Sequence, residues 1–241
     1  MFYCFVNPSD IDGGTITIRG ENFRHLKTVL HAGPGETIRV RSDRFVYEAR
    51  IDAVEKEKIA AKIISAKETG NAPTRRIVLC QALIQEKNFD LALQQAVQLG
   101  VSSVRPLLTR NVANHRMKPG KKERWEKIVL AAAMQSQRLE IPAVAEAAPF
   151  EEVLAGFAAS KGARLIMPYE LEEKRTIDAA LFENSAEIAL FIGPEGGWSA
   201  EEVGLARDRG VVTVTLGPHI LRSETAALVG LTLVFRSLGV L

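Results

Sequence analysis

Residues 187–238 constrain the fold more than any other segment, because a strand, a glycine-containing loop and a helix start occur there twice in succession. The apolar run EIALFI (187–192) leads into GPEGGW (193–198), and a helix start follows at Ser199. The run VVTVTL (211–216) then leads into a Gly-Pro loop, and a second helix starts near Ser223. Two such units predict an α/β domain. Loops that follow the strands of such a domain are its usual ligand-binding positions.

The chain before this segment continues the same alternation. Buried strands are predicted from three apolar runs, at 77–83, 101–108 and 163–168. Helical spacing predicts one helix that Asn88 caps and Gly100 ends, and a second helix over 121–137. Strands that alternate with helices indicate a parallel sheet covered on both faces.

The first 68 residues have a different pattern. Short alternating runs such as TITI and RFVYEARI are separated by glycine-containing turns, and one helical segment is expected near 21–31. This pattern is typical of a small β-barrel or β-rich module. The polar stretch at 68–73 contains glycine and proline and indicates a domain boundary, so we predict domains at 1–70 and 71–241.

Composition excludes several classes of protein. No apolar run approaches the ~18 residues of a membrane span, and the first residues lack an export pattern. Cys4 and Cys80 have neither disulfide nor metal-ligand spacing, which favours a reducing compartment. The histidines His25, His31 and His115 are scattered. We therefore expect a cytoplasmic protein with no membrane segment and no metal site.

The net charge of +2 is unevenly distributed. Residues 71–128 contain eleven basic and four acidic side chains, whereas residues 129–241 contain nine basic and fifteen acidic ones. A basic middle segment predicts a surface that faces a polyanion.

The first loop, at 193–198, allows two interpretations. It is either a tight crossover turn or a place where a ligand approaches the backbone, because glycine leaves room and Pro194 stiffens the turn. The spacing matches neither a nucleotide-hydrolase phosphate loop nor GxGxxG. Ser199 with Glu202 has the pattern of a capping box, which is a structural role.

The second loop, at 216–225, carries apolar residues where polar turn residues are expected. Ile220 and Leu221 either line a pocket for a flat aromatic group such as adenine or fill the core. Ser223 would cap the last helix, and Glu224 in its first turn would favour the helix dipole.

Together GPEGGWSAEE and LGPHILRSETAAL closely resemble the paired motifs of the RsmE family, the 16S rRNA (uracil-N3)-methyltransferases of the SPOUT superfamily. The resemblance extends over nearly the whole chain and includes ALIQEKNFDLALQQAVQLGV and KKERWEKIVLAAAMQSQR. It implies an α/β fold with a SPOUT-type parallel sheet and a carboxy-terminal trefoil knot, preceded by a PUA-like β-barrel. It also implies a homodimer that acts on ribosomal RNA or the small ribosomal subunit.

The resemblance implies S-adenosylmethionine as the cofactor, held by the two loops. The candidate cofactor-binding residues are Met167, Ile192, Gly193, Pro194, Glu195, Gly196, Gly197, Leu216, Gly217, Ile220, Leu221, Arg222, Glu224, Thr225 and Ala226.

Three candidate catalytic residues follow from the same motifs. Arg222 would stabilise negative charge on the uracil carbonyl oxygens, because a guanidinium stays cationic and donates from a plane. Glu195 would position the target or accept a proton, or else stabilise its own loop. Arg138 either reaches the target nucleotide or a phosphate, or is a surface cation after a helix.

The basic tract from 105 to 127 is either a solvated helix face or an RNA-contacting surface, and its loop at 111–120 favours phosphate contact. The candidate RNA-binding residues are Arg24, Arg110, Arg116, Lys118, Lys121 and Lys122.

Several family cations are replaced in this chain. His31 and His219 stand where the family usually has arginine, and Gln85-Glu86 stands where it has Lys-Gly. These departures motivate two alternatives: a SPOUT methyltransferase acting on a different RNA site, and a catalytically silent RNA-binding or assembly protein.

Overall fold

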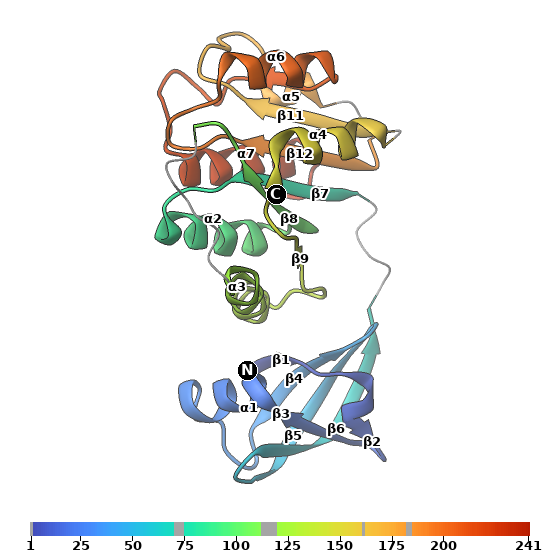
Figure 1. Cartoon of the computed structure of the whole chain (residues 1–241). Coiled ribbons are helices and arrows are strands. Elements are labelled where there is room, and N and C mark those ends of the chain that lie inside the picture. The colour runs from blue at the N-terminus through green and yellow to red at the C-terminus, as the bar shows by residue number, and fades with distance from the viewer. Residues whose placement is uncertain (1, 70–74, 112–119, 161, 182–184) are drawn as a thin grey trace. The chain divides into compact units, whose positions relative to one another are not determined.

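The chain forms two compact units, residues 1–72 and 73–241 (Figure 1). The computed structural model describes residues 2–69, 75–111, 120–160, 162–181 and 185–241. Among these residues, no helix is both long and apolar enough to cross a membrane.

Unit 1 is built on a six-stranded mixed sheet in the order β1-β4-β5-β6-β3-β2. The strands are β1 (Phe2–Phe5), β2 (Ile11–Asp12), β3 (Thr15–Arg19), β4 (Thr37–Ser42), β5 (Phe45–Val54) and β6 (Lys58–Glu68). β1 and β4 are parallel, and the other neighbours are antiparallel. A short 3-10 helix, η1 (Pro8–Asp10), precedes β2.

The alternation in the sequence accounts for the core of unit 1. In β3, Ile16 and Ile18 are fully buried, while the threonines beside them are partly exposed, as expected for a sheet with one buried face. The helical segment expected near 21–31 is confirmed as α1 (Gly20–Arg24) followed by the π-helical η2 (His25–Val29). This segment places Phe23 and Leu26 in the core.

Unit 2 contains a parallel sheet in the order β10-β8-β7-β12-β11-β13, with β9 also paired to β8. The strands are β7 (Arg76–Ala82), β8 (Ser103–Leu108), β9 (Ala143–Val144), β10 (Ala148–Pro149), β11 (Ala163–Pro168), β12 (Glu187–Ile192) and β13 (Val212–Val214). All pairings are parallel. The predicted parallel α/β sheet is confirmed, and β12 lies between β7 and β11 although it follows both in sequence.

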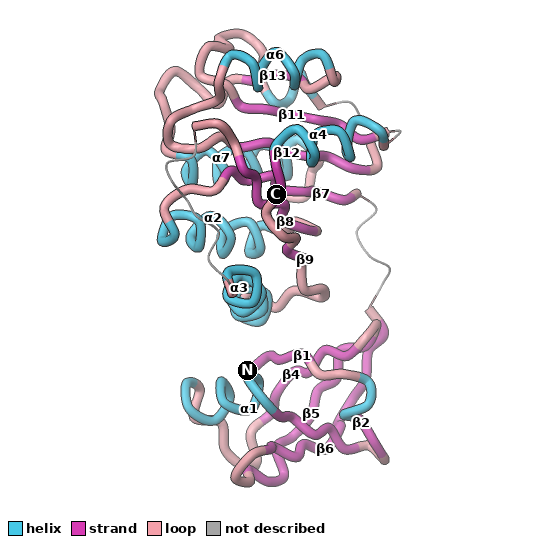
Figure 2. Tube along the Cα trace, viewed as in Figure 1, coloured by secondary structure: helices cyan, strands magenta, loops and turns pink. Residues whose placement is uncertain are grey.

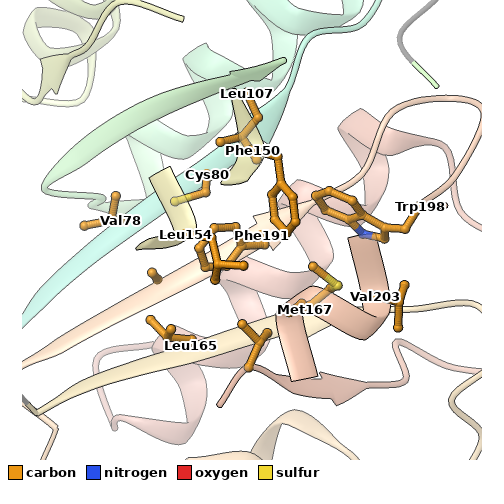
Figure 3. Packing of buried hydrophobic residues seen from close by; sticks show 13 residues of the cluster. Val78, Cys80, Leu107, Phe150, Leu154, Leu165, Met167, Phe191, Trp198 and Val203 are labelled. Carbon is orange, nitrogen blue, oxygen red and sulfur yellow. The ribbon is translucent and has the colours of Figure 1, made fainter. Parts of the chain in front are cut away.

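Helices cover both faces of this sheet (Figure 2). They are α2 (Glu86–Leu99), α3 (Lys121–Gln135), α4 (Phe150–Ala159), α5 (Ile177–Ala180), α6 (Ala200–Asp208) and α7 (Ser223–Ser237). α4 and α6 pack on one face, in a cluster with Cys80, Phe191 and Trp198 (Figure 3). α7 packs on the other face, where Gly230 closely approaches Leu190. Alternate residues of β12 therefore face opposite layers.

The predicted start of the first helix in unit 2 is wrong. α2 begins at Glu86 with Gln85 as its N-cap residue, so Asn88 lies in the first turn. The carbonyl of Gln85 accepts from the N–H groups of Asn88 and Phe89, which shows that the helix has already begun. The predicted end is confirmed, because Gly100 has a left-handed φ of 118°.

Candidate functional site

A pocket of about 460 Å³ lies at the carboxyl ends of β11, β12 and β13. Its lining residues are Pro168, Tyr169, Glu170, Ile192, Gly193, Pro194, Glu195, Gly196, Gly197, Trp198, Thr215, Leu216, Gly217, Pro218, His219, Ile220, Leu221, Arg222, Ser223 and Ala226. The structure thus brings the two glycine-containing loops together in one cavity. The carboxyl edge of a parallel sheet is where α/β proteins place their ligands.

The first loop is held from outside by hydrogen bonds. Glu195 Oε1 accepts from the N–H of Gln85, at 2.9 Å. The amide of Asn111 donates to the carbonyls of Gly196 and Gly197, at 3.3 and 3.1 Å. These bonds connect the loop after β12 to the segments that follow β7 and β8, so its backbone has a defined position.

Two glycines in the first loop are required by their surroundings. A Cβ on Gly193 would lie 3.0 Å from Nε1 of Trp198, an indole fixed in the core. Gly197 has a φ of +70°, and a Cβ there would lie 3.0 Å from Glu170 Oε1. Neither position accommodates a larger residue without displacement.

The predicted capping box is confirmed. Ser199 Oγ accepts from the N–H of Glu202 at 3.2 Å, and Glu202 Oε2 accepts from the N–H of Ser199 at 2.9 Å. The other oxygen of Glu202 accepts from the N–H of Arg110 at 2.9 Å. Glu202 therefore joins the start of α6 to the end of β8 as well as capping the helix.

The second loop presents apolar side chains to the pocket. Ile220 is 89% exposed, so the interpretation that it fills the core is wrong. Leu221 is half-buried and also lines the pocket. Gly217 has a φ of 120°, and its N–H donates to Thr215 Oγ1 at 3.1 Å. An exposed isoleucine in a cavity is the kind of surface that a bound apolar group covers.

Ser223 does not cap the last helix, which corrects the sequence prediction. Arg222 is the N-cap residue of α7, and no side chain caps this helix. The Ser223 hydroxyl instead accepts from Gln81 Nε2 at 2.8 Å and donates to the carbonyl of Gly193 at 2.5 Å. The hydroxyl is used to join three elements, so it is not available to the helix N-terminus.

Twelve of the fifteen predicted cofactor-binding residues line the pocket, and the exceptions are Met167, Glu224 and Thr225. Met167 is fully buried in the cluster under α4 and α6. Glu224 is in the first turn of α7, as predicted, and is also buried; its Oε2 has no hydrogen-bond partner among the described residues. Cofactor contacts by these three residues stay predictions.

The candidate catalytic residues are separated. Arg222 and Glu195 line the pocket, and Arg222 is exposed. Arg138 does not line it: its guanidinium donates to the carbonyls of Val97, Gly100 and Val101, at 3.1, 3.3 and 2.6 Å. Burial lowers the pKa of Arg138. These bonds stabilise the carboxyl end of α2, and a catalytic role for Arg138 stays a prediction.

The candidate RNA-binding residues lie on several elements. Arg24 is exposed at the end of α1, and the Arg110 guanidinium is 3.3 Å from the carboxylate of Glu201. Lys121 begins α3, and Lys122 forms ion pairs within α3 and with Glu146. Arg116 and Lys118 lie outside the described residues.

Residues after β11 complete the pocket and were missed in the sequence. Tyr169 and Glu170 directly follow that strand. The signal was present, because residues after a predicted parallel strand lie at the same edge as the two loops. Trp198 was also missed as a lining residue. Within the described residues, no group of three histidines, cysteines or carboxylates is placed to hold a metal ion.

Comparison with known proteins identifies the class of this fold and site. Residues 71–235 match the model of the RNA methyltransferase domain family. The chain is 32% identical over 218 residues to ribosomal RNA small subunit methyltransferase E of Mesomycoplasma hyopneumoniae, covering 88% of this chain and 93% of that relative. It is 29% identical to the Bacillus subtilis protein of the same name, covering 90% and 88%. The chain therefore belongs to the ribosomal RNA small subunit methyltransferase E family of RNA methyltransferases.

A solved structure agrees with this assignment. The crystal structure of ribosomal RNA small subunit methyltransferase E from Neisseria gonorrhoeae, bound to S-adenosyl methionine, superposes with a TM-score of 0.84 at 28% identity. The match covers 98% of this chain and 97% of that chain. Both units therefore have counterparts in a family member.

Proposed function

We propose that this protein transfers a methyl group from S-adenosylmethionine to N3 of a uridine in 16S ribosomal RNA. Family membership supports the reaction class. The observation that carries the proposal is the single pocket that both glycine-containing loops form, with Arg222 on its lining. The methylated position on the uracil and the roles of individual residues are likewise proposed here.

The residues of the pocket fit S-adenosylmethionine. A volume of about 460 Å³ is within the range of small-molecule sites. Gly193, Gly196 and Gly197 line one side of the pocket, so backbone groups form part of its wall there. Ile220 and Leu221 offer apolar surface on the other, where a flat adenine would replace water. The loops thus combine polar backbone groups with an apolar wall.

Bound S-adenosylmethionine supplies an electrophilic methyl group. The residues of this chain orient the reactants, and orientation alone contributes on the order of 7–11 kcal/mol in favourable cases. Arg222 lies near the end of the second loop, and its guanidinium makes no hydrogen bond or ion pair with the described residues. Its guanidinium is therefore available to stabilise the charge that develops on the uracil oxygens when the N3 proton leaves.

Glu195 acts mainly by positioning in this proposal. One of its oxygens already accepts from the N–H of Gln85, which holds the first loop in place. Glu195 lines the pocket, and its second oxygen is the candidate that accepts a proton from, or hydrogen-bonds to, the target base.

The wider architecture is part of the proposal. We propose that the segment after β12 forms the trefoil knot of SPOUT domains, which is supported by the late strand β12 lying between β7 and β11. The sheet of unit 1 is proposed to be a PUA-like barrel, with Arg24 and the basic residues before and within α3 contacting RNA. The protein is proposed to act in the cytoplasm as a homodimer.

Mass spectrometry of ribosomal RNA tests the function directly. Ribosomal RNA from cells that lack this protein should lose one methylated uridine, and adding the purified protein with S-adenosylmethionine should restore it. No loss and no restoration would overturn the proposal. Calorimetry with S-adenosylmethionine adds a second test, since a silent assembly protein need not bind it.

A further inference from the structure

A buried chain of hydrogen bonds joins three elements behind the pocket. Gln81, the second-last residue of β7, is 1% exposed. Its Nε2 donates to Ser223 Oγ at 2.8 Å, and that hydroxyl donates to the carbonyl of Gly193 at 2.5 Å. Ser223 begins α7, and Gly193 directly follows β12. Side chains 142 positions apart are thus connected by a buried hydrogen bond.

Gln81 fixes the direction in which the Ser223 hydroxyl points. Its Nε2 also donates to the carbonyl of Ala82, at 3.1 Å. The reversed amide would place oxygen against that carbonyl, so the observed orientation is the favourable one. A serine hydroxyl has one proton. The Ser223 oxygen accepts a hydrogen bond from the Gln81 amide. The hydroxyl proton of Ser223 therefore points away from Gln81 and toward the carbonyl of Gly193.

The chain of bonds ends at the two loops of the pocket. Gly193 begins the first loop, and Ser223 follows Arg222 at the end of the second. Gln81 itself does not line the pocket. A fixed bond between Ser223 and Gly193 therefore sets the distance between the glycine loop and the residue proposed to stabilise the uracil charge. Both bonds of the Ser223 hydroxyl are made, whereas Gln81 Oε1 has no hydrogen-bond partner among the described residues, so the amide is held through its Nε2 alone.

We infer that Gln81 is a positioning residue for methyl transfer, acting through Ser223 to hold the two pocket loops in register. The inference rests on the proposed function, since it concerns the position of Arg222, the residue proposed to stabilise the uracil charge. It differs from a role in stability alone, because misplacement of reacting groups by about 1 Å can lower a rate on the order of 100-fold.

The test compares Gln81→Met, Ser223→Ala and the double variant. Methionine has a similar length but no donor, and it leaves the rest of the chain of bonds in place. At saturating S-adenosylmethionine and ribosomal RNA, kcat should fall by about 10- to 100-fold in Gln81→Met. The double variant should be no worse than Ser223→Ala, because Gln81 acts through Ser223. Additive losses, or a kcat within about threefold of the unchanged protein, would overturn the inference.

Ile77→Val is the matched control. Ile77 is buried at the opposite end of the same strand, so this variant lowers stability without touching the pocket. Its kcat should remain near that of the unchanged protein. If kcat falls equally in Ile77→Val, the loss in Gln81→Met is explained by lower stability alone, and the positioning role is overturned.

Hydrogen–deuterium exchange without S-adenosylmethionine provides a readout that does not depend on activity. In Gln81→Met, exchange should rise in peptides covering 193–198 and 216–223, while in Ile77→Val it should not. Unchanged exchange in both loops would overturn the inference even if the enzyme is active. Absence of methyl transfer by the unchanged protein would instead count against the proposed function, and the exchange measurement would still decide whether Gln81 holds the loops.

Discussion

Glu195 and Gln85 are 110 positions apart, yet the carboxylate of Glu195 accepts a 2.9 Å hydrogen bond from the backbone N–H of Gln85. This bond attaches the loop after β12 to the residue that precedes α2. The glycine loop is therefore held in place by a side chain of its own, and the role of Glu195 in holding the loop can be separated from any role in moving a proton.

Replacement of Glu195 distinguishes these roles. Glu195→Gln keeps the oxygen that accepts from Gln85, so we expect nearly normal affinity for S-adenosylmethionine. Glu195→Ala removes the acceptor and should weaken that affinity about five- to tenfold, since a net hydrogen bond contributes about 1 kcal/mol. Calorimetry measures both. If single-turnover methyl transfer is lost equally in the two variants, the negative charge itself is needed and Glu195 acts on the proton.

Gly193→Ala should damage the pocket through a steric contact. The added Cβ would lie 3.0 Å from the Trp198 indole nitrogen. Overpacking of this kind costs about 1–3 kcal/mol, so affinity for S-adenosylmethionine should fall about 5- to 100-fold in calorimetry. Gly204→Ala on α6 is the matched control, because nothing lies within 4 Å of its Cβ position. Normal affinity in Gly193→Ala would show that the indole moves freely.

Arg222→Ala should keep S-adenosylmethionine binding and lose most methyl transfer. Loss of one donor to a developing negative charge typically costs about 10²- to 10³-fold in rate. Arg222→Lys keeps the charge but not the planar pair of donors, so its rate should lie between the two. Single-turnover kinetics with ribosomal RNA measures this. A near-normal rate for the alanine variant would remove Arg222 from the mechanism.

Charge reversal of Lys118, Lys121 and Lys122 to glutamate should weaken RNA binding and flatten its dependence on salt. Each lost phosphate contact lowers the slope of log affinity against log salt by about 0.7–0.9. Binding to a 16S fragment at several salt concentrations measures the slope. Lys174→Glu with Arg209→Glu, two exposed cations elsewhere on unit 2, provides the control. An unchanged slope in the triple variant would exclude these lysines from the RNA contact.

Unit 1 should lose stability in alkaline solution through Cys4. Burial raises the pKa of the Cys4 thiol to about 12, whereas an unfolded thiol ionises near pH 8.5. The folded state therefore keeps its proton while the unfolded state releases it, and stability falls as pH rises above about 8.5. Between about pH 8 and 10, urea unfolding followed by circular dichroism should show a loss about 1–2 kcal/mol larger than in Cys4→Ala. Equal pH dependence in the two proteins would contradict this.

Local patterns predicted most elements of unit 2. The apolar runs at 77–83, 163–168 and 187–192 became β7, β11 and β12, and the Ser199–Glu202 spacing became a capping box. The start of α2 was misjudged because Asn88 is a good cap by residue type, while the chain turns three residues earlier at Gln85. Residue type predicts which residues can cap a helix, but the backbone conformation decides where the helix begins.

The pocket was predictable only in part. Glycine spacing predicted the loop at 193–198. The hydrogen bonds of the Ser223 hydroxyl could not be predicted, because its partner Gln81 lies on a strand 142 positions away. The order of the strands could not be predicted either, since an apolar run does not specify which other strand it pairs with. Met167 is in the core, one residue before the first pocket-lining residue, and its cofactor contact stays a prediction.

The central position of β12 has a consequence for how the chain matures. β7 and β11 are joined in the sheet only through a strand that ends at residue 192. Native pairing across the middle of unit 2 therefore cannot form on a nascent chain until four-fifths of the sequence has been made, and long-range pairing of this kind is slow. Ser223 also lines the pocket, so a chain truncated before this residue would lack a complete pocket. Binding competence is therefore acquired late in synthesis, once the chain extends past Ala226.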